Sequence, residues 1–333
     1  MFEKFYDVVK ESAWEGRVDS ETDFDSFRWH QWVKTLDLRD KNLEAFQGKL
    51  GFAFLGFSSD EGVRLNKGRT GAANGPHSIR EELVNLPCQF TEDIALYDAG
   101  NISFKGDSLD EAQKALGEAV SKLLDLNLFP ILLGGGHEIA FGHYQGVLNH
   151  LKQKDEHKDI GIINFDAHFD LRPYHKTGTS GTMFKQIADL TDKESINYSY
   201  FCLGIQEHGN TTSLFNIADE LGVEYIYARE IRSTDSYRMM ERLDDFIKKQ
   251  DHLYVTVCSD VFSSAFAPGV SATQPLGLSP EKVLIFLKHV FRSEKSISFD
   301  IAEVSPRFDQ DNTTANLASV IIFSVVDTLS KII

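Results

Sequence analysis

From about residue 50 to its end, the chain alternates short apolar runs with amphipathic segments. Apolar runs of five to eight residues are typical of buried strands, whereas apolar positions repeated every three or four residues are typical of helices. Eight strands are predicted, at residues 51–57, 94–99, 128–134, 160–166, 198–205, 224–228, 253–260 and 296–303. Helices are predicted at residues 108–126, 279–291 and 313–333, with Ser108 and Ser279 at N-cap positions.

This alternation predicts βαβ units, which place parallel strands in one sheet with helices on both faces. The expected fold is therefore α/β: a three-layer α/β/α domain with a central, mainly parallel eight-stranded sheet. Residues 1–50, rich in acidic and aromatic side chains, are expected to form an N-terminal extension packed on a single domain that spans residues 1–333. The apolar run at 320–326 is too short to span a bilayer and predicts a buried C-terminal helix.

Composition and charge exclude several classes of partner. The formal net charge of −16 over 333 residues argues against nucleic acid and anionic membranes. Residues 1–20 carry acids throughout and no apolar core, so we expect no secretory signal and a cytoplasmic protein. Three widely spaced cysteines argue against a disulfide framework. The sequence does not fix the oligomeric state and leaves a homo-oligomer open, and any anionic substrate must meet a local cluster of basic side chains.

Polar side chains gather at predicted strand ends, where open α/β sheets bind ligands. After the apolar run I-G-I-I-N-F, the chain reads D-A-H-F-D. Since alternate residues of an extended chain share a face, Asp166, His168 and Asp170 can converge on a divalent cation such as Mn²⁺. Taken alone, the triplet fits equally well a carboxylate that caps the next helix beside a histidine packed in the core.

Two further clusters follow other predicted strands. The motif G-G-G-H-E contains His137 and lacks the lysine and the spacing of a phosphate-binding loop. The segment C-S-D places Cys258 and Asp260 on one face, and Glu303 ends the last predicted strand. These are more ligands than one metal needs, and they suit two cations that share an activated hydroxide.

In order along the chain, G-G-G-H-E, N-F-D-A-H-F-D-L-R and the segment ending in A-P-G resemble the three metal motifs of the ureohydrolase superfamily, the dimanganese arginases, agmatinases and formimidoylglutamases. The resemblance covers residues 51 to about 310. Residues 60–80, W-E-G-R at 14–17 and S-G-T at 180–182 are most similar to the formimidoylglutamase branch. The resemblance implies an arginase-like fold and a cytoplasmic hydrolase of histidine metabolism. Its expected reaction converts N-formimidoyl-L-glutamate to L-glutamate and formamide, with a hydroxide bridging two Mn²⁺ ions.

The same resemblance implies a metal ligand set. His137 and Asp170 correspond to ligands of one Mn²⁺, and His168 and Asp260 correspond to ligands of the other. Asp166 corresponds to a carboxylate that bridges both ions.

Cys258 departs from the family pattern, because a second bridging aspartate is usual at that position. A thiolate can bridge two metals, but it is softer than a carboxylate and binds Zn²⁺ or Fe²⁺ in preference to Mn²⁺. The alternative is a weakened second site that fills only at high metal concentration, and the sequence leaves both interpretations open.

The resemblance also implies two catalytic roles. Asp170 would carry a proton to the leaving amine, and Glu303 would pair with the cationic formimidoyl nitrogen. A strand-end salt bridge is the alternative role for Glu303.

Substrate binding is inferred from charge. Basic residues lie in one glycine-flanked loop and directly after D-A-H-F-D (Arg64, Lys67, Arg69 and Arg172). Because a guanidinium binds a carboxylate through two parallel hydrogen bonds, Arg69 and Arg172 are the expected anchors for a small anionic substrate. Asn66 and Gln206 are expected to add hydrogen bonds. The alternative for each basic residue is a solvated surface charge.

Three other functions compete with this prediction. Another amidino-hydrolase, such as a guanidino-acid hydrolase or an agmatinase, would share the metal motifs, but an agmatinase would need acids where the basic residues lie. A metal-poor, non-catalytic relative is the second alternative, since one bridging ligand is altered. A nucleotide-binding α/β protein is disfavoured, because the phosphate-loop residues are missing.

Overall fold

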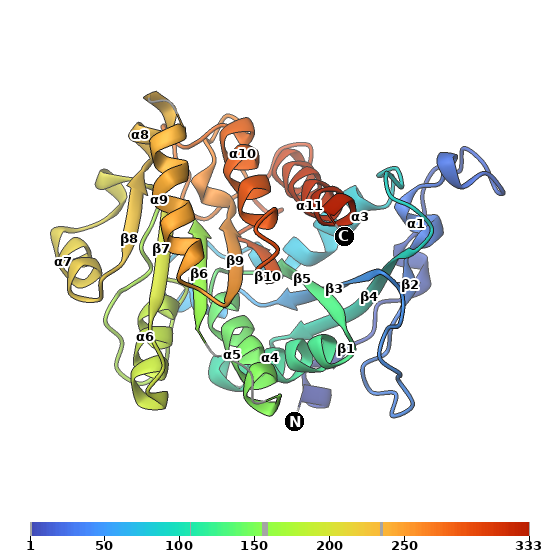
Figure 1. Cartoon of the computed structure of the whole chain (residues 1–333), viewed down its shortest axis with the longest axis horizontal. Helices are drawn as coiled ribbons and strands as arrows, with labels where there is room; N and C mark the ends of the chain where they lie inside the picture. The colour runs from blue at the N-terminus through green and yellow to red at the C-terminus, as the bar shows by residue number, and fades with distance from the viewer. Residues whose placement is uncertain (1, 107, 155–158, 234–235, 333) are drawn as a thin grey trace.

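The computed structural model describes residues 2–106, 108–154, 159–233 and 236–332. One sheet runs through the molecule in the strand order β1-β4-β3-β5-β10-β9-β6-β7-β8, and β2 also pairs with β4 (Figure 1). The strands are β1 (Tyr6–Asp7), β2 (Lys34–Thr35), β3 (Leu50–Ser58), β4 (Ile94–Ser103), β5 (Leu128–Gly134), β6 (Ile160–Phe165), β7 (Ser199–Ile205), β8 (Glu224–Tyr227), β9 (His252–Cys258) and β10 (Ser296–Ala302). Among them β1 alone pairs in antiparallel fashion.

The eight predicted strands are all present, as β3 to β10, but the sheet has ten strands, so the expected number of eight is wrong. The two additional strands come from residues 1–50, and both pair with β4. Each is only two residues long. A segment that short contains no full alternation of apolar and polar positions, so periodicity cannot reveal it.

Helices cover the two faces of the sheet, which confirms the predicted three layers (Figure 1). One layer contains α3 (Gly75–Leu83), α8 (Ala228–Ser233), α9 (Tyr237–Lys248), α10 (Pro280–Phe291) and α11 (Thr313–Ile332). The other contains α4 (Leu109–Asp125), α5 (Ile139–Gln153), α6 (Met183–Glu194) and α7 (Thr212–Glu220). The short helices α1 (Trp29–Trp32) and α2 (Glu61–Leu65) lie in connecting segments. Ser108 and Ser279 are N-cap residues of α4 and α10, as predicted, although neither side chain makes a capping hydrogen bond.

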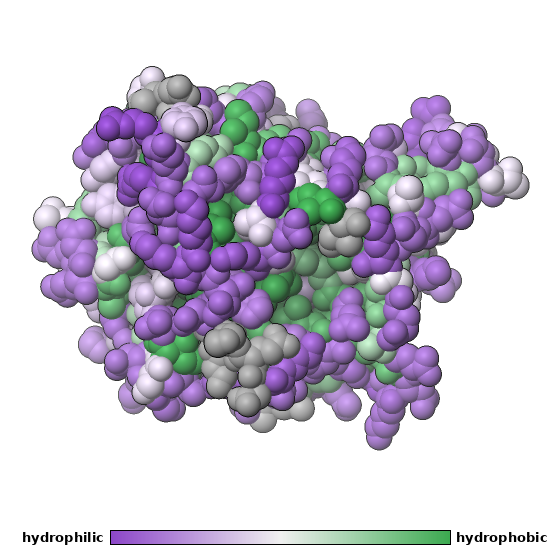
Figure 2. Space-filling view, in the orientation of Figure 1, coloured by the Kyte–Doolittle hydropathy of each residue, from purple (hydrophilic) through white to green (hydrophobic). Residues whose placement is uncertain are grey.

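Alternation along single strands divides the core into two clusters. In β3, Phe52 and Phe54 belong to the cluster under α3 and α11, whereas Ala53 and Leu55 belong to the cluster under α4 and α5. Both clusters exclude water from strands buried on both faces, as a parallel sheet requires. The outer side of helices such as α9 is mainly hydrophilic (Figure 2).

Residues 1–50 make buried contacts with the rest of the chain. The indole Nε1 of Trp14 donates to Asp98 Oδ2 at 2.7 Å, and Arg80 donates two hydrogen bonds to the same carboxylate at 2.8 and 2.9 Å. Trp14 and Trp29 each stack on Phe54, with ring centroids 5.9 and 5.6 Å apart. The carboxylate of Asp98 is buried but fully engaged, as a buried charge must be.

The C-terminal helix α11 is long and apolar enough to cross a membrane by length and composition alone, and 56% of its most apolar window is buried inside the protein. Ile321, Ile322 and Val325 are almost fully buried in the cluster shared with α3 and α10. The helix is therefore buried on one side, as the sequence predicts.

Candidate metal centre and substrate cavity

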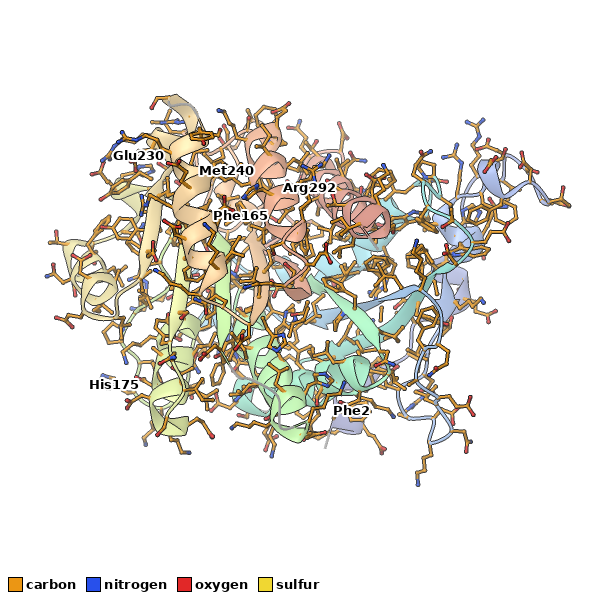
Figure 3. All side chains as sticks on the ribbon, in the orientation of Figure 1. Phe2, Phe165, His175, Glu230, Met240 and Arg292 are labelled. Carbon is orange, nitrogen blue, oxygen red and sulfur yellow. The ribbon has the colours of Figure 1, made fainter. Side chains whose placement is uncertain are left out.

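The four motifs meet at one edge of the sheet. β5, β10, β9 and β6 are consecutive parallel neighbours, so their carboxyl ends lie side by side. G-G-G-H-E lies at the end of β5, Glu303 follows β10, and C-S-D lies at the end of β9. D-A-H-F-D follows Phe165, which is the last residue of β6 and lies in the interior of the protein (Figure 3). A cavity of about 280 Å³ opens above them, lined by Asn66, Lys67, Gly68, Arg69, His137, His168, Asp170, Arg172, Ser180, Gly209, Cys258, Asp260, Ser271, Ala272 and Glu303.

Each histidine presents its Nδ1 atom to two carboxylates. His137 Nδ1 lies 3.0 Å from Asp166 Oδ2 and 3.3 Å from Asp170 Oδ2. His168 Nδ1 lies 3.5 Å from Asp166 Oδ1 and 3.1 Å from Asp260 Oδ2. The two oxygens of Asp166 therefore face different histidines, which is the arrangement that a bridging carboxylate needs.

Cys258 joins this cluster from the end of β9. Ligand atoms of His137, Asp166 and Cys258 lie within 4.8 Å of one another, as do those of Asp166, His168 and Asp260. Asp166 is common to both groups. Burial raises the pKa of the Cys258 thiol well above its ordinary value, and the surrounding carboxylates raise it further. The sulfur is consequently a neutral thiol until a cation is near enough to displace its proton.

The charges of the cluster are strongly coupled. Burial alone would lower the pKa of both histidines. The carboxylates of Asp166 and Asp170 raise the pKa of His137 well above its ordinary value. The carboxylates of Asp260 and Asp166 do the same for His168. Burial, and next the charge of Asp166, raises the pKa of Asp170 to about 6. Burial would also raise the pKa of Asp166, yet its contacts with the two histidines hold it below the ordinary value. Positive charge is thus required between these carboxylates, from protons or from a metal.

Two buried glutamates stand behind the cluster. Glu303 Oε1 accepts a hydrogen bond from the backbone N–H of His137 at 2.9 Å, and burial, with the charge of Glu138 next, raises its pKa to about 8. Glu138 Oε1 accepts from Gly62 N at 2.8 Å and from Ser59 Oγ at 3.2 Å, and burial raises its pKa to about 7. Glu138 therefore ties the metal loop to the segment that leads into the basic loop.

The residues present fit a divalent metal centre. Asp260 Oδ1 and Glu303 Oε2 are buried and have no hydrogen-bond partner among the described residues, and His137 Nδ1 faces two carboxylates. Asp170 and Glu303 have positive φ angles of 49° and 65°, a backbone conformation that glutamate rarely adopts and that concentrates at functional sites. Imidazole, carboxylate and thiolate are donors that bind Mn²⁺, Zn²⁺ or Fe²⁺. A cation beside the shared carboxylate of Asp166 would give these buried acceptors a partner.

The structure places three of the four expected substrate contacts in the cavity. Asn66, Arg69 and Arg172 line it, whereas Gln206 does not. The side chain of Gln206 is buried and donates from Nε2 to the carbonyl of Leu276 at 2.7 Å. Gln206 therefore anchors a neighbouring loop.

The guanidinium of Arg69 is held in place by the protein. Its Nε donates to the Ser271 carbonyl at 2.9 Å, and its Nη2 donates to the Val270 carbonyl at 2.7 Å. Its carbon lies 4.1 Å from the ring centroid of Phe308. Only the terminal edge of Arg69 remains for a ligand, while Arg172 makes no ion pair within the described part of the chain.

Several residues of the site escaped the sequence reasoning. Ser180 and Ser271 line the cavity; Ser180 belongs to S-G-T at 180–182, which was given no site role, and Ser271 is an isolated serine without a recognisable pattern. Thr256 and Asp300 lie just below His137 and are fully buried. Their signal was present, since a polar residue inside an otherwise apolar strand needs a buried partner.

The fold and the histidine–carboxylate cluster together define a protein of the arginase family. The family model described as Arginase family matches residues 50–327, and the chain belongs to this family. It is 61% identical to a formimidoylglutamase of Clostridium tetani over 328 residues, which cover 98% of this chain and 97% of that protein.

Solved structures agree on the fold. The crystal structure of formimidoylglutamase from Bacillus subtilis superposes with a TM-score of 0.79 at 23% identity, covering 95% of this chain and 96% of that one. Formiminoglutamase of Trypanosoma cruzi, solved with Mn²⁺, superposes with a TM-score of 0.73 at 24% identity, covering 86% of this chain and 97% of that one. The arginase-like fold is thereby confirmed.

Proposed function

We propose that this protein hydrolyses N-formimidoyl-L-glutamate to L-glutamate and formamide. The observation that carries the proposal is one cavity with a histidine–carboxylate cluster at its floor and two arginines, Arg69 and Arg172, on its lining. The full-length similarity to a formimidoylglutamase supports it. Water adds to the formimidoyl carbon, the bond from that carbon to the glutamate nitrogen breaks, and a proton passes to the nitrogen that leaves.

The metal ligands follow from the contacts at the strand ends. His137 and Asp170 would hold one Mn²⁺, His168 and Asp260 the other, and Asp166 would bridge them. Bound cations would lower the pKa of water in the site and so supply a hydroxide nucleophile near neutral pH. Cys258 stands at the second bridging position, next to His137 and Asp166.

Asp170 and Glu303 would act on the substrate. Asp170 lines the cavity and would take a proton from the attacking water and pass it to the leaving nitrogen. Glu303 has an unpartnered Oε2 that can accept a hydrogen bond from the formimidoyl nitrogen. A cationic amidine beside Glu303 would lower the raised pKa of that carboxyl and form a charge-assisted pair.

The arginines would bind the two carboxylates of the substrate. Arg69 is pre-organised by carbonyls and by Phe308, so little side-chain entropy is lost when a ligand binds. Arg172 offers its whole guanidinium, and Lys67 adds a third positive charge to the lining. Asn66 also lines the cavity, as a hydrogen-bonding group.

The direct test is the product spectrum of the Mn²⁺-loaded protein. N-formimidoyl-L-glutamate should yield formamide and L-glutamate in equal amounts, while arginine and agmatine should yield no urea. Urea from either guanidino compound without formamide from the first substrate would overturn the proposal. Less than one metal per chain together with no turnover would instead indicate a non-catalytic relative.

Charge-removing variants test the substrate contacts. Arg69→Ala and Arg172→Ala should each lower kcat/KM about 10- to 100-fold, because a hydrogen bond to a charged group contributes about 1.5–3 kcal/mol. Arg64→Ala is the matched control, since Arg64 lies in α2, just before the loop that contains Arg69, and pairs with Glu61 outside the cavity lining. An equal loss in all three variants would contradict the assignment.

A further inference from the structure

The imidazole of His137 is held on its far side by a buried chain of hydrogen bonds. His137 Nε2 lies 3.0 Å from Thr256 Oγ1, and that hydroxyl donates to Asp300 Oδ1 at 2.6 Å. The other oxygen of Asp300 accepts from Tyr254 Oη and also contacts His143 Nδ1, both at 2.6 Å. All five side chains are at most 1% exposed, so water does not compete for these bonds.

The sheet itself sets this arrangement. Thr256 in β9 and Asp300 in β10 are direct partners in the parallel register, so their side chains lie side by side on one face. His137 follows β5, which is the other neighbour of β10. The chain of hydrogen bonds therefore crosses three adjacent strands beneath the metal cluster.

The direction of the hydrogen bonds fixes the position of one proton. A carboxylate can only accept hydrogen bonds, and the hydroxyls of Tyr254 and Thr256 both donate to Asp300. Thr256 has a single hydroxyl hydrogen, and because that hydrogen points to Asp300, the oxygen can only accept from His137. Nε2 must carry hydrogen, which leaves Nδ1 as the atom that faces the carboxylates of Asp166 and Asp170.

We propose that Thr256 and Asp300 are positioning residues that hold His137 as the Nε2–H tautomer, with Nδ1 directed at a metal ion. The inference rests on the proposed metal site and adds two residues that touch neither metal nor substrate. Asp300, through Thr256, makes His137 a stronger electron donor and prevents its ring from turning. Hydrogen-bond partners of metal-binding histidines characteristically act in this way.

The test removes the hydroxyl of Thr256 without changing its shape. Thr256→Val should weaken Mn²⁺ binding about 10- to 100-fold, measured by competition with a fluorescent chelator. Thr256→Ser keeps the hydroxyl and should restore affinity to within about threefold of wild type. Thr191→Val is the matched control, because Thr191 is equally buried but donates to the Ala188 carbonyl within α6. A folded Thr256→Val protein with wild-type affinity would overturn the inference.

The wild-type protein supplies an independent measurement if Thr256→Val does not fold. With ¹⁵N-labelled histidine and Zn²⁺ as a diamagnetic probe, NMR should show His137 with a protonated Nε2 and a metal-bound Nδ1. A protonated Nδ1 with a metal-bound Nε2 would overturn the inference while leaving the proposed function intact. Wild-type protein that binds neither Mn²⁺ nor Zn²⁺ would overturn the proposed metal site as well.

Discussion

Replacing Cys258 with aspartate should improve Mn²⁺ binding at neutral pH. Cys258 lies with His137 and Asp166 inside a group of ligand atoms no more than 4.8 Å apart, so its side chain can reach a shared cation. Its thiol must first lose a proton, whereas a carboxylate at that position is ionised beside a metal. Activity should be kept or raised in Cys258→Asp, because the other ligands are unchanged.

The size of the effect follows from the thiol pKa. At its ordinary value of 9.0, about 1% of a thiol is ionised at pH 7, and burial places Cys258 above that value. Two pH units correspond to about 2.7 kcal/mol, or about 100-fold in affinity, which is the minimum cost of deprotonation. Because Mn²⁺ also prefers oxygen donors to sulfur, we expect Cys258→Asp to bind Mn²⁺ about 100-fold more tightly. The advantage should shrink about tenfold for each unit of rising pH.

The assay is Mn²⁺ titration of both proteins at pH 7 and pH 8, with formamide release measured on the same samples. Loading the protein with Co²⁺ tests directly whether the Cys258 sulfur binds metal, since a thiolate ligand gives a charge-transfer absorption band. That band should be present in wild type and in Cys88→Ser, whose altered cysteine is buried elsewhere, and absent from Cys258→Asp. Weaker metal binding together with lost activity in Cys258→Asp would refute the reasoning and assign the thiol a specific role.

Three further predictions concern stability. Glu138 has a pKa of about 7 in the folded protein against an ordinary 4.5, so the folded state retains a proton that the unfolded state loses. The free energy of unfolding of the metal-free protein should therefore fall by up to about 3 kcal/mol as the pH rises from 4.5 to 7. Urea unfolding of Glu138→Gln should lack that part of the slope, and an unchanged slope would contradict it. Trp14→Phe removes a 2.7 Å bond to the buried Asp98 carboxylate and should lower the free energy of unfolding by about 1.5–3 kcal/mol, with wild-type stability as the contrary result. Mn²⁺ at 100 times its Kd should raise stability by about 2.7 kcal/mol and EDTA should reverse this, whereas a Tm indifferent to both would argue against a metal centre.

The sequence predicted the sheet well because each main strand is a continuous apolar run. The predicted strand ends were less accurate where polar residues form hydrogen bonds inside the protein. β4 continues to Ser103 beyond the predicted residue 99, through Gly100 and Asn101, and Asn101 Oδ1 accepts a hydrogen bond from Arg80 Nη1 at 2.8 Å. Hydropathy treats such residues as the end of a strand, while the structure satisfies them with internal hydrogen bonds.

The candidate ligands could be brought together from sequence because parallel neighbouring strands end at one edge. The same logic does not give side-chain direction in loops. Gln206 follows β7 at that edge, yet its amide turns to the Leu276 carbonyl and not to the cavity. Arg69 was expected to anchor a carboxylate through two parallel hydrogen bonds, and the structure shows that two backbone carbonyls already occupy one of its donor edges. These details depend on contacts between segments that are distant in sequence.

The arrangement of charge within the cavity would allow a net acidic protein to bind the proposed dianionic substrate. The floor carries Asp170, Asp260 and Glu303, and the lining also carries Arg69 and Arg172. A ligand with a cationic amidine at one end and carboxylates at the other gains from both ends only when its amidine points to the floor. A ligand with a cationic tail would leave that tail beside the arginines, and like charges in a partly buried site are costly. On the proposed function, local charge at Arg69 and Arg172 would decide selectivity, and the overall charge of −16 would not.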